Sequence, residues 1–101
     1  MSETQYVIAH DQDGHRFTVT EDGLTAELNY RTSGSEMIIT HIGVPRPLEG
    51  RGIGSALAKA GLEYAREQGM EVVPLCPFVR SYIERKPEYQ PLVRSSSGGF
   101  A

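Results

Sequence analysis

The chain has 101 residues and a formal net charge of −3, with ten lysines and arginines set against thirteen aspartates and glutamates. This length suits one domain and is too short for a second hydrophobic core. Charges of both signs are interspersed, so the sequence lacks the basic face of a nucleic-acid-binding protein, and we expect no nucleic acid among its partners.

Membrane and metal partners are not expected either. No apolar run approaches the roughly 20 residues that span a bilayer, and the start, Met1-Ser2-Glu3-Thr4, lacks the basic and apolar stretches of a signal peptide. A cytoplasmic location is therefore the default expectation. The single cysteine cannot form an internal disulfide, and the three histidines, His10, His15 and His41, show no metal-ligand spacing.

The first forty residues alternate between apolar and polar side chains, which predicts an antiparallel meander. The alternation is clearest where Leu24, Ala26, Leu28 and Tyr30 share one face. Short segments at 11–14, 21–23 and 32–35 have the composition of hairpin connections. A fourth strand, at about 36–44, is more continuously apolar, so we expect it to be covered on both faces until Pro45 and Pro47 end it.

Three alternate glycines, Gly50, Gly52 and Gly54, come directly before a helix expected at 54–68. The predicted inner face of this helix consists of Leu57, Ala60, Gly61, Tyr64 and Ala65, and Gly69 is placed as its C-terminal cap. A buried strand at 71–75 follows, parallel to the fourth strand because a helix connects the two. A shorter helix at 78–85 is ended by Pro87.

These elements predict an α+β fold in which an antiparallel meander continues into a parallel strand pair, with two helices. We expect one domain over residues 1–93. The remainder, 94–101, has no pattern and is expected to be a mobile tail.

A glycine loop before a helix suits an anion. Glycine adopts positive φ and allows a ligand to approach the backbone, so successive N–H groups can converge on one phosphate while the helix dipole favours its charge. A Walker A loop is excluded because Gly54 is followed by Ser55-Ala56 and not by Lys-Ser or Lys-Thr. A dinucleotide fingerprint is excluded because Ser55 or Leu57 stands where its third glycine would fall. A plain glycine-rich turn into a helix is the alternative.

A third pattern fits better. The run 49–54 resembles the acyl-CoA pyrophosphate loop of GNAT-type N-acetyltransferases, whose signature is Arg or Gln, two residues, Gly, one residue, and Gly or Ala. His41, Val44-Pro45 and the segments 72–79, 82–83 and 87–89 are similar to small, stand-alone GNAT-like proteins. The resemblance covers roughly residues 24–93 and implies the central part of the GNAT fold. The helices between the first strands and the additional C-terminal strands, which usually shape the acceptor site, do not fit in this chain.

The resemblance implies acetyl-CoA as cofactor, held by backbone N–H groups of the loop and by the open edges of the fourth and fifth strands. The implied cofactor-binding residues are Val44, Gly50, Arg51, Gly52, Ile53, Gly54 and Ser55. Two positions depart from the family pattern. Glu49 replaces Arg or Gln and adds negative charge near a pyrophosphate, which we expect Arg51 to offset. Ile42-Gly43 replace the usual Thr-Glu, so a carboxylate that could act as a base is absent.

Three residues are candidates for catalysis. His41 ends the fourth strand, where the resemblance places the thioester, and is either a general base or a histidine packed in the sheet, with a relaying water as a further option. Cys76 ends the fifth strand and is an acyl-enzyme nucleophile, a group near the thioester, or a small buried hydrophobe. Tyr82 stands where GNAT enzymes often carry a tyrosine that protonates the CoA thiolate; a core aromatic is the alternative.

The leading hypothesis is an acetyl-CoA-dependent N-acetyltransferase in which an amine of unknown identity, on a small molecule or a protein, attacks the thioester directly. Acyl transfer through Cys76 is an alternative mechanism. A non-catalytic CoA-binding or acyl-CoA-binding module is a second function, favoured by the missing acceptor helices and by Ile42-Gly43. A protein that retains only the fold, for interaction with a partner, is a third and predicts no cofactor binding.

Overall fold

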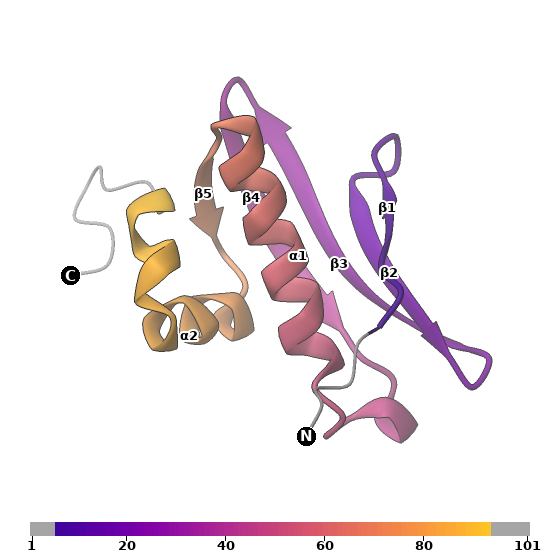
Figure 1. Ribbon diagram of the computed structural model, residues 1–101. Helices are drawn as coiled ribbons and strands as arrows, with labels where there is room; N and C mark the ends of the chain where they lie inside the picture. The colour runs from indigo at the N-terminus through magenta and orange to yellow at the C-terminus, as the bar shows by residue number, and fades with distance from the viewer. Residues whose placement is uncertain (1–5, 94–101) are drawn as a thin grey trace.

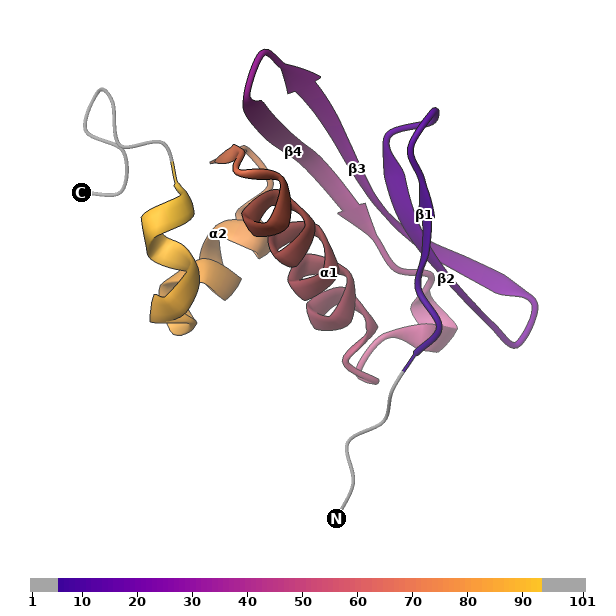
Figure 2. The same ribbon diagram turned by 45° about the horizontal axis from the view of Figure 1, so that its top comes forward.

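The computed structural model describes residues 6–93, so the tail expected at 94–101 lies outside the described residues. Its centre is a five-stranded sheet in the order β1-β2-β3-β4-β5, drawn in Figures 1 and 2. The strands are β1 Ala9–Asp11, β2 Arg16–Glu21, β3 Leu24–Ser33, β4 Glu36–Gly43 and β5 Glu71–Pro74. Strands β1 to β4 pair antiparallel, whereas β5 pairs parallel with β4. The predicted α+β fold, a meander that continues into a parallel pair, is therefore confirmed.

Two α-helices and two 3₁₀ helices complete the described chain. They are η1 Arg46–Leu48, α1 Ile53–Gln68, α2 Pro77–Arg85 and η2 Pro87–Leu92. Both predicted α-helices are present and begin one residue earlier than expected. The sequence pattern predicts no 3₁₀ helices, because it assigns Pro47 and Pro87 only the role of ending the elements before them. Proline fixes φ near −65°, which ends a strand but also suits the first turn of a short helix.

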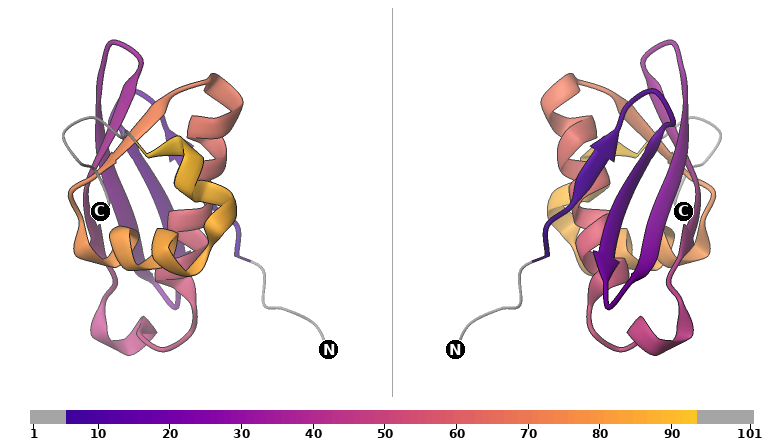
Figure 3. Two further views of the ribbon diagram at one scale, coloured as in Figure 1. Left: turned by 90° about the vertical axis from the view of Figure 1, so that its left-hand side faces the viewer. Right: turned by 90° about the vertical axis from the view of Figure 1, so that its right-hand side faces the viewer.

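Helix α1 lies across one face of the sheet, and no helix among residues 6–93 covers the opposite face (Figure 3). Helices α2 and η2 pack against α1 beside β5. The expectation that the fourth strand is covered on both faces is therefore wrong. In β4 only Met37 and Ile39 are buried, whereas Ile38 and Thr40, which alternate with them, are half-buried.

Small residues allow α1 to lie close to the sheet. Gly61 is buried, and a Cβ added to it would lie 3.4 Å from Leu28 Cδ1 and 3.6 Å from Met37 Cε. Of the predicted inner face, Leu57, Gly61 and Ala65 are buried, while Ala60 and Tyr64 are half-buried. The buried residues of α1 also include Ile53, Ala58 and Leu62, because α1 packs against α2 and η2 as well as against the sheet.

Strand β4 changes its pairing near its C-terminal end. A bulge in the β3–β4 ladder shifts the register between Asn29 and Tyr30, so Tyr30 pairs with Ile39 while Asn29 pairs with His41. On its other edge β4 pairs with β5 only as far as Ile39, opposite Pro74. The N–H groups of Leu75 and Cys76 both donate to the Ile39 carbonyl, at 3.0 and 3.2 Å, and β5 then gives way to α2. Residues 40–43 therefore have no strand partner on the β5 side.

Candidate functional site

The glycine loop after β4 takes a backbone conformation that glycine adopts readily. Gly50 has a φ of +82° and Gly52 a φ of +81°, both in the left-handed region. A Cβ added at either position would meet nothing within 4 Å. Side chains are absent from these positions because of the backbone angle and not because of crowding, and the space beside the loop is open to a ligand.

Helix α1 begins at this loop, and its N-terminus has no side-chain cap. Gly52 is the N-cap residue, no side chain caps the helix, and the first turn contains no acidic residue. The first N–H groups of an α-helix have no partner within the helix, and the helix dipole places partial positive charge at that end. A free N-terminus with open glycines before it is the arrangement that binds phosphate or another anion.

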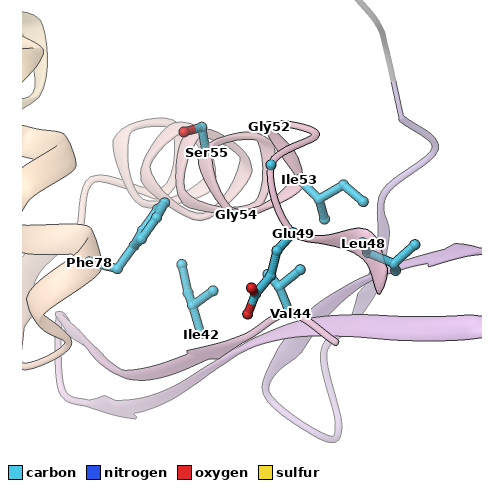
Figure 4. Close-up of a pocket in the computed structure, with 10 residues that line it drawn as sticks. Ile42, Val44, Leu48, Glu49, Gly52, Ile53, Gly54, Ser55 and Phe78 are labelled. Carbon is cyan, nitrogen blue, oxygen red and sulfur yellow. The ribbon is translucent and has the colours of Figure 1, made fainter. Parts of the chain in front are cut away.

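A cavity of about 450 Å³ opens beside this N-terminus (Figure 4). We call it the loop cavity, and it is lined by Ile42, Val44, Leu48, Glu49, Gly50, Gly52, Ile53, Gly54, Ser55 and Phe78. It therefore lies between the loop, the end of β4 that has no β5 partner, and the first turn of α2. Of the seven predicted cofactor-binding residues, all except Arg51 line it.

Arg51 points elsewhere. Its Nη1 atom donates to Asp22 Oδ2 at 3.1 Å, an ion pair with the turn between β2 and β3. The expectation that Arg51 offsets the charge of Glu49 is therefore wrong, because the guanidinium is already paired with another carboxylate.

A second cavity, of about 690 Å³, lies on the outer side of α1. We call it the helix cavity. The N-terminal segment contributes Tyr6 and Ile8, α1 and the loop contribute most of the lining, and α2 and the residue after it contribute Tyr82 and Lys86. Arg51, Lys59, Glu63 and Lys86 are its charged residues. Gly52 and Ser55 line both cavities, so the two meet at the start of α1.

Tyr82 lines the helix cavity and not the loop cavity. Its ring is buried and stacks on Tyr89 at 6.2 Å between centroids, with the Lys86 Nζ atom 5.9 Å from the ring centre. Burial, and next Glu88, raise the pKa of Tyr82 above its ordinary value, so the phenol, which is protonated at neutral pH in any case, is a weaker acid than an exposed tyrosine. The residue thus has the proton that a general acid needs, and it also fits the alternative of a packed aromatic.

His41 and Cys76 both lie just beyond the last paired residues of β4 and β5, His41 at the end of β4 and Cys76 after the end of β5. His41 is exposed, pairs with Asn29 across the ladder, and lines neither cavity. Its ring lies near Gly43, whose added Cβ would be 3.1 Å from His41 Nε2. Cys76 is buried, is the N-cap residue of α2, and also lines neither cavity. The structure does not bring His41, Cys76 and Tyr82 together in one cavity, and their catalytic roles stay predictions.

Phe78 lines the loop cavity but is not among the predicted cofactor-binding residues; the same is true of Ile42, Leu48 and Glu49, of which only Glu49 was expected near the ligand. Phe78 is 42% exposed although it is aromatic, and its ring would meet a Cβ on Gly54 at 3.0 Å, so it forms a wall of the loop cavity beside the first turn of α1. The sequence contained a signal in its spacing: Val79, Tyr82 and Ile83 recur at the three- and four-residue intervals of one helix face, and Phe78 falls outside that face. A large apolar residue left out of a helix's buried face is a candidate for ligand contact.

Among residues 6–93, no group of three or more His, Cys, Asp or Glu side chains is placed to hold a metal ion. Within the same range, no helix is both long and apolar enough to cross a membrane.

Comparison with known proteins gives consistent matches. A family model described as GCN5-related N-acetyl-transferase matches residues 16–92. The protein NATD1 of Homo sapiens is 32% identical over 90 residues, which cover 86% of this chain and 80% of NATD1; NATD1 of Gallus gallus is 31% identical over 83 residues, covering 79% and 76%. An NMR structure of a candidate GCN5-like N-acetyltransferase from Staphylococcus aureus has a TM-score of 0.71 and 31% identity, with 93% of this chain and 91% of that chain covered.

Proposed function

The chain belongs to the GCN5-related N-acetyltransferase family, and on that premise we propose that it binds acetyl-CoA and transfers the acetyl group to an amine. The observation that carries the proposal is the uncapped N-terminus of α1, which opens into the loop cavity beside the unpaired edge of β4. Anion affinity and an extended hydrogen-bonding edge thus meet in one place, as a ligand with a phosphate end and an amide-containing arm requires.

The described residues fit each part of such a ligand. Backbone N–H groups of the loop, from Gly50 to Ser55, hold the pyrophosphate, for which the open space beside Gly50 and Gly52 leaves room. The β5-facing edge of residues 40–43 bonds the amides of the pantetheine arm, with Ile42, Val44 and Phe78 packing against it.

Acetyl-CoA, when bound, supplies an activated acetyl thioester to the attacking nitrogen. His41 takes a proton from the acceptor amine, directly or through a water, as the carbon–nitrogen bond forms. Tyr82, whose phenol is protonated at neutral pH, gives a proton to the sulfur as the carbon–sulfur bond breaks. His41 pairs with Asn29, which alternates along β3 with the buried Leu28 and Tyr30, so the exposed His41 side chain lies on the face of the sheet opposite α1, and we propose that the acceptor approaches from there.

Release of free thiol from acetyl-CoA tests the enzyme proposal. The protein is incubated with acetyl-CoA and with polyamines, amino acids or peptides that have a free N-terminus. We expect at least one class to accelerate thiol release above hydrolysis, and Tyr82→Phe to lower that rate about tenfold or more while CoA still binds. Tyr64→Phe is the matched control, because Tyr64 packs in an aromatic cluster with Phe17 and lines neither cavity. If Tyr82→Phe turns over as fast as Tyr64→Phe, Tyr82 is not the acid.

A CoA-binding module without turnover is the second candidate function. It is favoured by the separation of His41, Cys76 and Tyr82, which share no cavity. In that case CoA and acetyl-CoA stabilise the protein against thermal unfolding but no acceptor releases thiol. Absence of both binding and turnover would instead leave the fold-only function. Acyl transfer through Cys76 is tested by mass spectrometry of the protein after exposure to acetyl-CoA. A mass increase of about 42 Da on Cys76, which corresponds to one acetyl group, would support this mechanism.

A further inference from the structure

The carboxylate of Glu49 lies inside the loop cavity. Glu49 follows η1 in an extended conformation, with φ −65° and ψ 150°. Figure 4 shows its side chain directed away from the loop, with the carboxylate toward Ile42 and Val44. The side chain therefore occupies the space between the loop and the end of β4, where the proposed ligand passes.

This carboxylate is not neutralised by a neighbouring cation. Within the part of the chain that the structure describes, Glu49 is the one ionisable residue that lines the loop cavity. Among residues 6–93, the ion pairs join Arg16, Arg51 and Arg66 to other carboxylates, and Glu49 takes part in none of them. A cavity whose backbone groups attract an anion thus contains one full negative charge that repels it.

We propose that Glu49 sets the donor specificity of the loop cavity by penalising acyl donors in proportion to their phosphate charge. The inference rests on the proposed function, because it assumes that a pantetheine thioester enters this cavity. Like charges at this range weaken binding by an amount that grows with each unit of ligand charge. The side chain is exposed, so water screens the repulsion, and the expected effect on CoA affinity is a few-fold in total, shared among the phosphate charges of the ligand. Compared with the same cavity without Glu49, the cavity with Glu49 therefore shifts its preference away from thioesters of CoA and toward thioesters of pantetheine or 4′-phosphopantetheine.

A charge series of ligands tests this inference by calorimetric titration at low salt. The probes are pantetheine, 4′-phosphopantetheine, dephospho-CoA and CoA, and the variant is Glu49→Gln, which keeps the size of the side chain and removes its charge. Glu67→Gln is the matched control, since Glu67 is an exposed residue near the other end of α1 and its loss changes the net charge equally.

We expect Glu49→Gln to tighten CoA binding about three- to tenfold, to tighten dephospho-CoA and 4′-phosphopantetheine binding less, and to leave pantetheine binding unchanged. The gain should shrink as salt is raised, because mobile ions screen the repulsion, whereas a steric effect of Glu49 would not depend on salt. Glu67→Gln should change none of the affinities appreciably.

Two results would overturn the inference in distinguishable ways. If CoA binds wild-type protein and Glu49→Gln with equal affinity, or if pantetheine gains as much as CoA, Glu49 does not discriminate by charge although the proposed function stands. If no ligand of the series binds wild type, Glu49→Gln or Glu67→Gln, the proposed function fails and the inference fails with it.

Discussion

At the scale of single residues, two glycines of helix α1 can be compared to separate the effect of backbone conformation from the effect of ligand contact. Gly52 and Gly69 both have left-handed φ angles, of +81° and +68°, and an added Cβ at either would meet nothing within 4 Å. Gly69 ends α1, where its N–H donates to the carbonyls of Ala65 and Arg66. Gly52 begins α1 beside two cavities. The two positions have the same conformational demand, and only Gly52 lies at the candidate site.

This pair yields a prediction about binding. Gly52→Glu and Gly69→Glu should each lower the free energy of unfolding by roughly 1 kcal/mol, because both force a side chain into the left-handed region. Only Gly52→Glu should abolish CoA binding, since its side chain adds bulk and negative charge at the phosphate position. Urea unfolding and calorimetric titration of the two variants check this. Equal loss of affinity in both would assign the effect to general destabilisation.

The residues of the loop could be predicted from the sequence better than the residues opposite it. The spacing of Gly50, Gly52 and Gly54 before a helix predicts an anion loop, with a plain glycine-rich turn as the alternative, and the positive φ angles of Gly50 and Gly52 agree with either. The positions of Glu49 and Phe78 depend on how η1 and α2 are oriented across the cavity, and Arg51 on a pairing with Asp22 that is 29 residues distant. Such side-chain directions follow from tertiary contacts that no local pattern contains.

At the scale of elements, β4 and α1 together position the site. The bulge near Asn29 and the end of the β5 ladder at Ile39 leave the last part of β4 without a β5 partner. The strands and the crossover helix could be predicted from alternation and from the handedness rule. The bulge could not, because it shifts only one residue and leaves the apolar run of β4 intact.

Helix α1 is also joined to η2 through one carboxylate. The Tyr89 hydroxyl donates to Glu63 Oε2 at 2.5 Å, and Arg66 Nη2 donates to the same oxygen. The bonds from Tyr89 and then Arg66 lower the pKa of Glu63 below its ordinary 4.5. The pKa of Tyr89 is raised, chiefly by burial and further by Glu63. Glu63 is thus the acceptor that holds η2 on α1.

Because the pKa of Glu63 is lowered on folding, its ionised form stabilises the native state. That stabilisation is fully present above pH 4.5 and is lost as the pH falls through the lowered folded-state value. We expect Glu63→Gln to reduce the free energy of unfolding by about 1 kcal/mol at pH 7 and to have less effect near pH 3. Urea unfolding at both pH values measures this, with Glu67→Gln as control. A difference between Glu63→Gln and wild type that is constant with pH would contradict the assignment.

At the scale of the whole molecule, one face of the sheet is covered by α1 and the other has no helix among residues 6–93. The covered side of β2 and β3 ends in an aromatic cluster. There the His10 ring stacks on Phe17 with 4.0 Å between ring centroids and meets Tyr64 edge-on with 4.5 Å between centroids. His10 Nε2 also shares a 2.6 Å hydrogen bond with the Tyr30 hydroxyl. The overall order of elements could be predicted from the sequence, whereas the helix-free face could not, because β4 is apolar on both sides.

The aromatic cluster makes stability depend on pH near neutrality. Burial lowers the pKa of His10 below 6.5, an effect that Asp11 opposes and His15 reinforces. The native state therefore favours neutral His10, and its stabilisation is present above pH 6.5 and lost as the pH falls through the lowered value. We expect His10→Phe, which preserves stacking, to flatten the stability profile between pH 6.5 and 5. Thermal unfolding across that range checks this, and an unchanged slope would show that other groups cause the dependence.

The central claim is that the glycine loop and the end of β4 that has no β5 partner form one cofactor site. Amide NMR of ¹⁵N-labelled protein during titration with CoA tests it most directly, because it reports each backbone N–H separately. We predict saturable shifts concentrated at residues 42–44 and 49–55 and at Phe78, and no such shifts in Gly52→Glu. Millimolar CoA that leaves these amides unmoved in wild type, or that moves them equally in Gly52→Glu, would contradict the account.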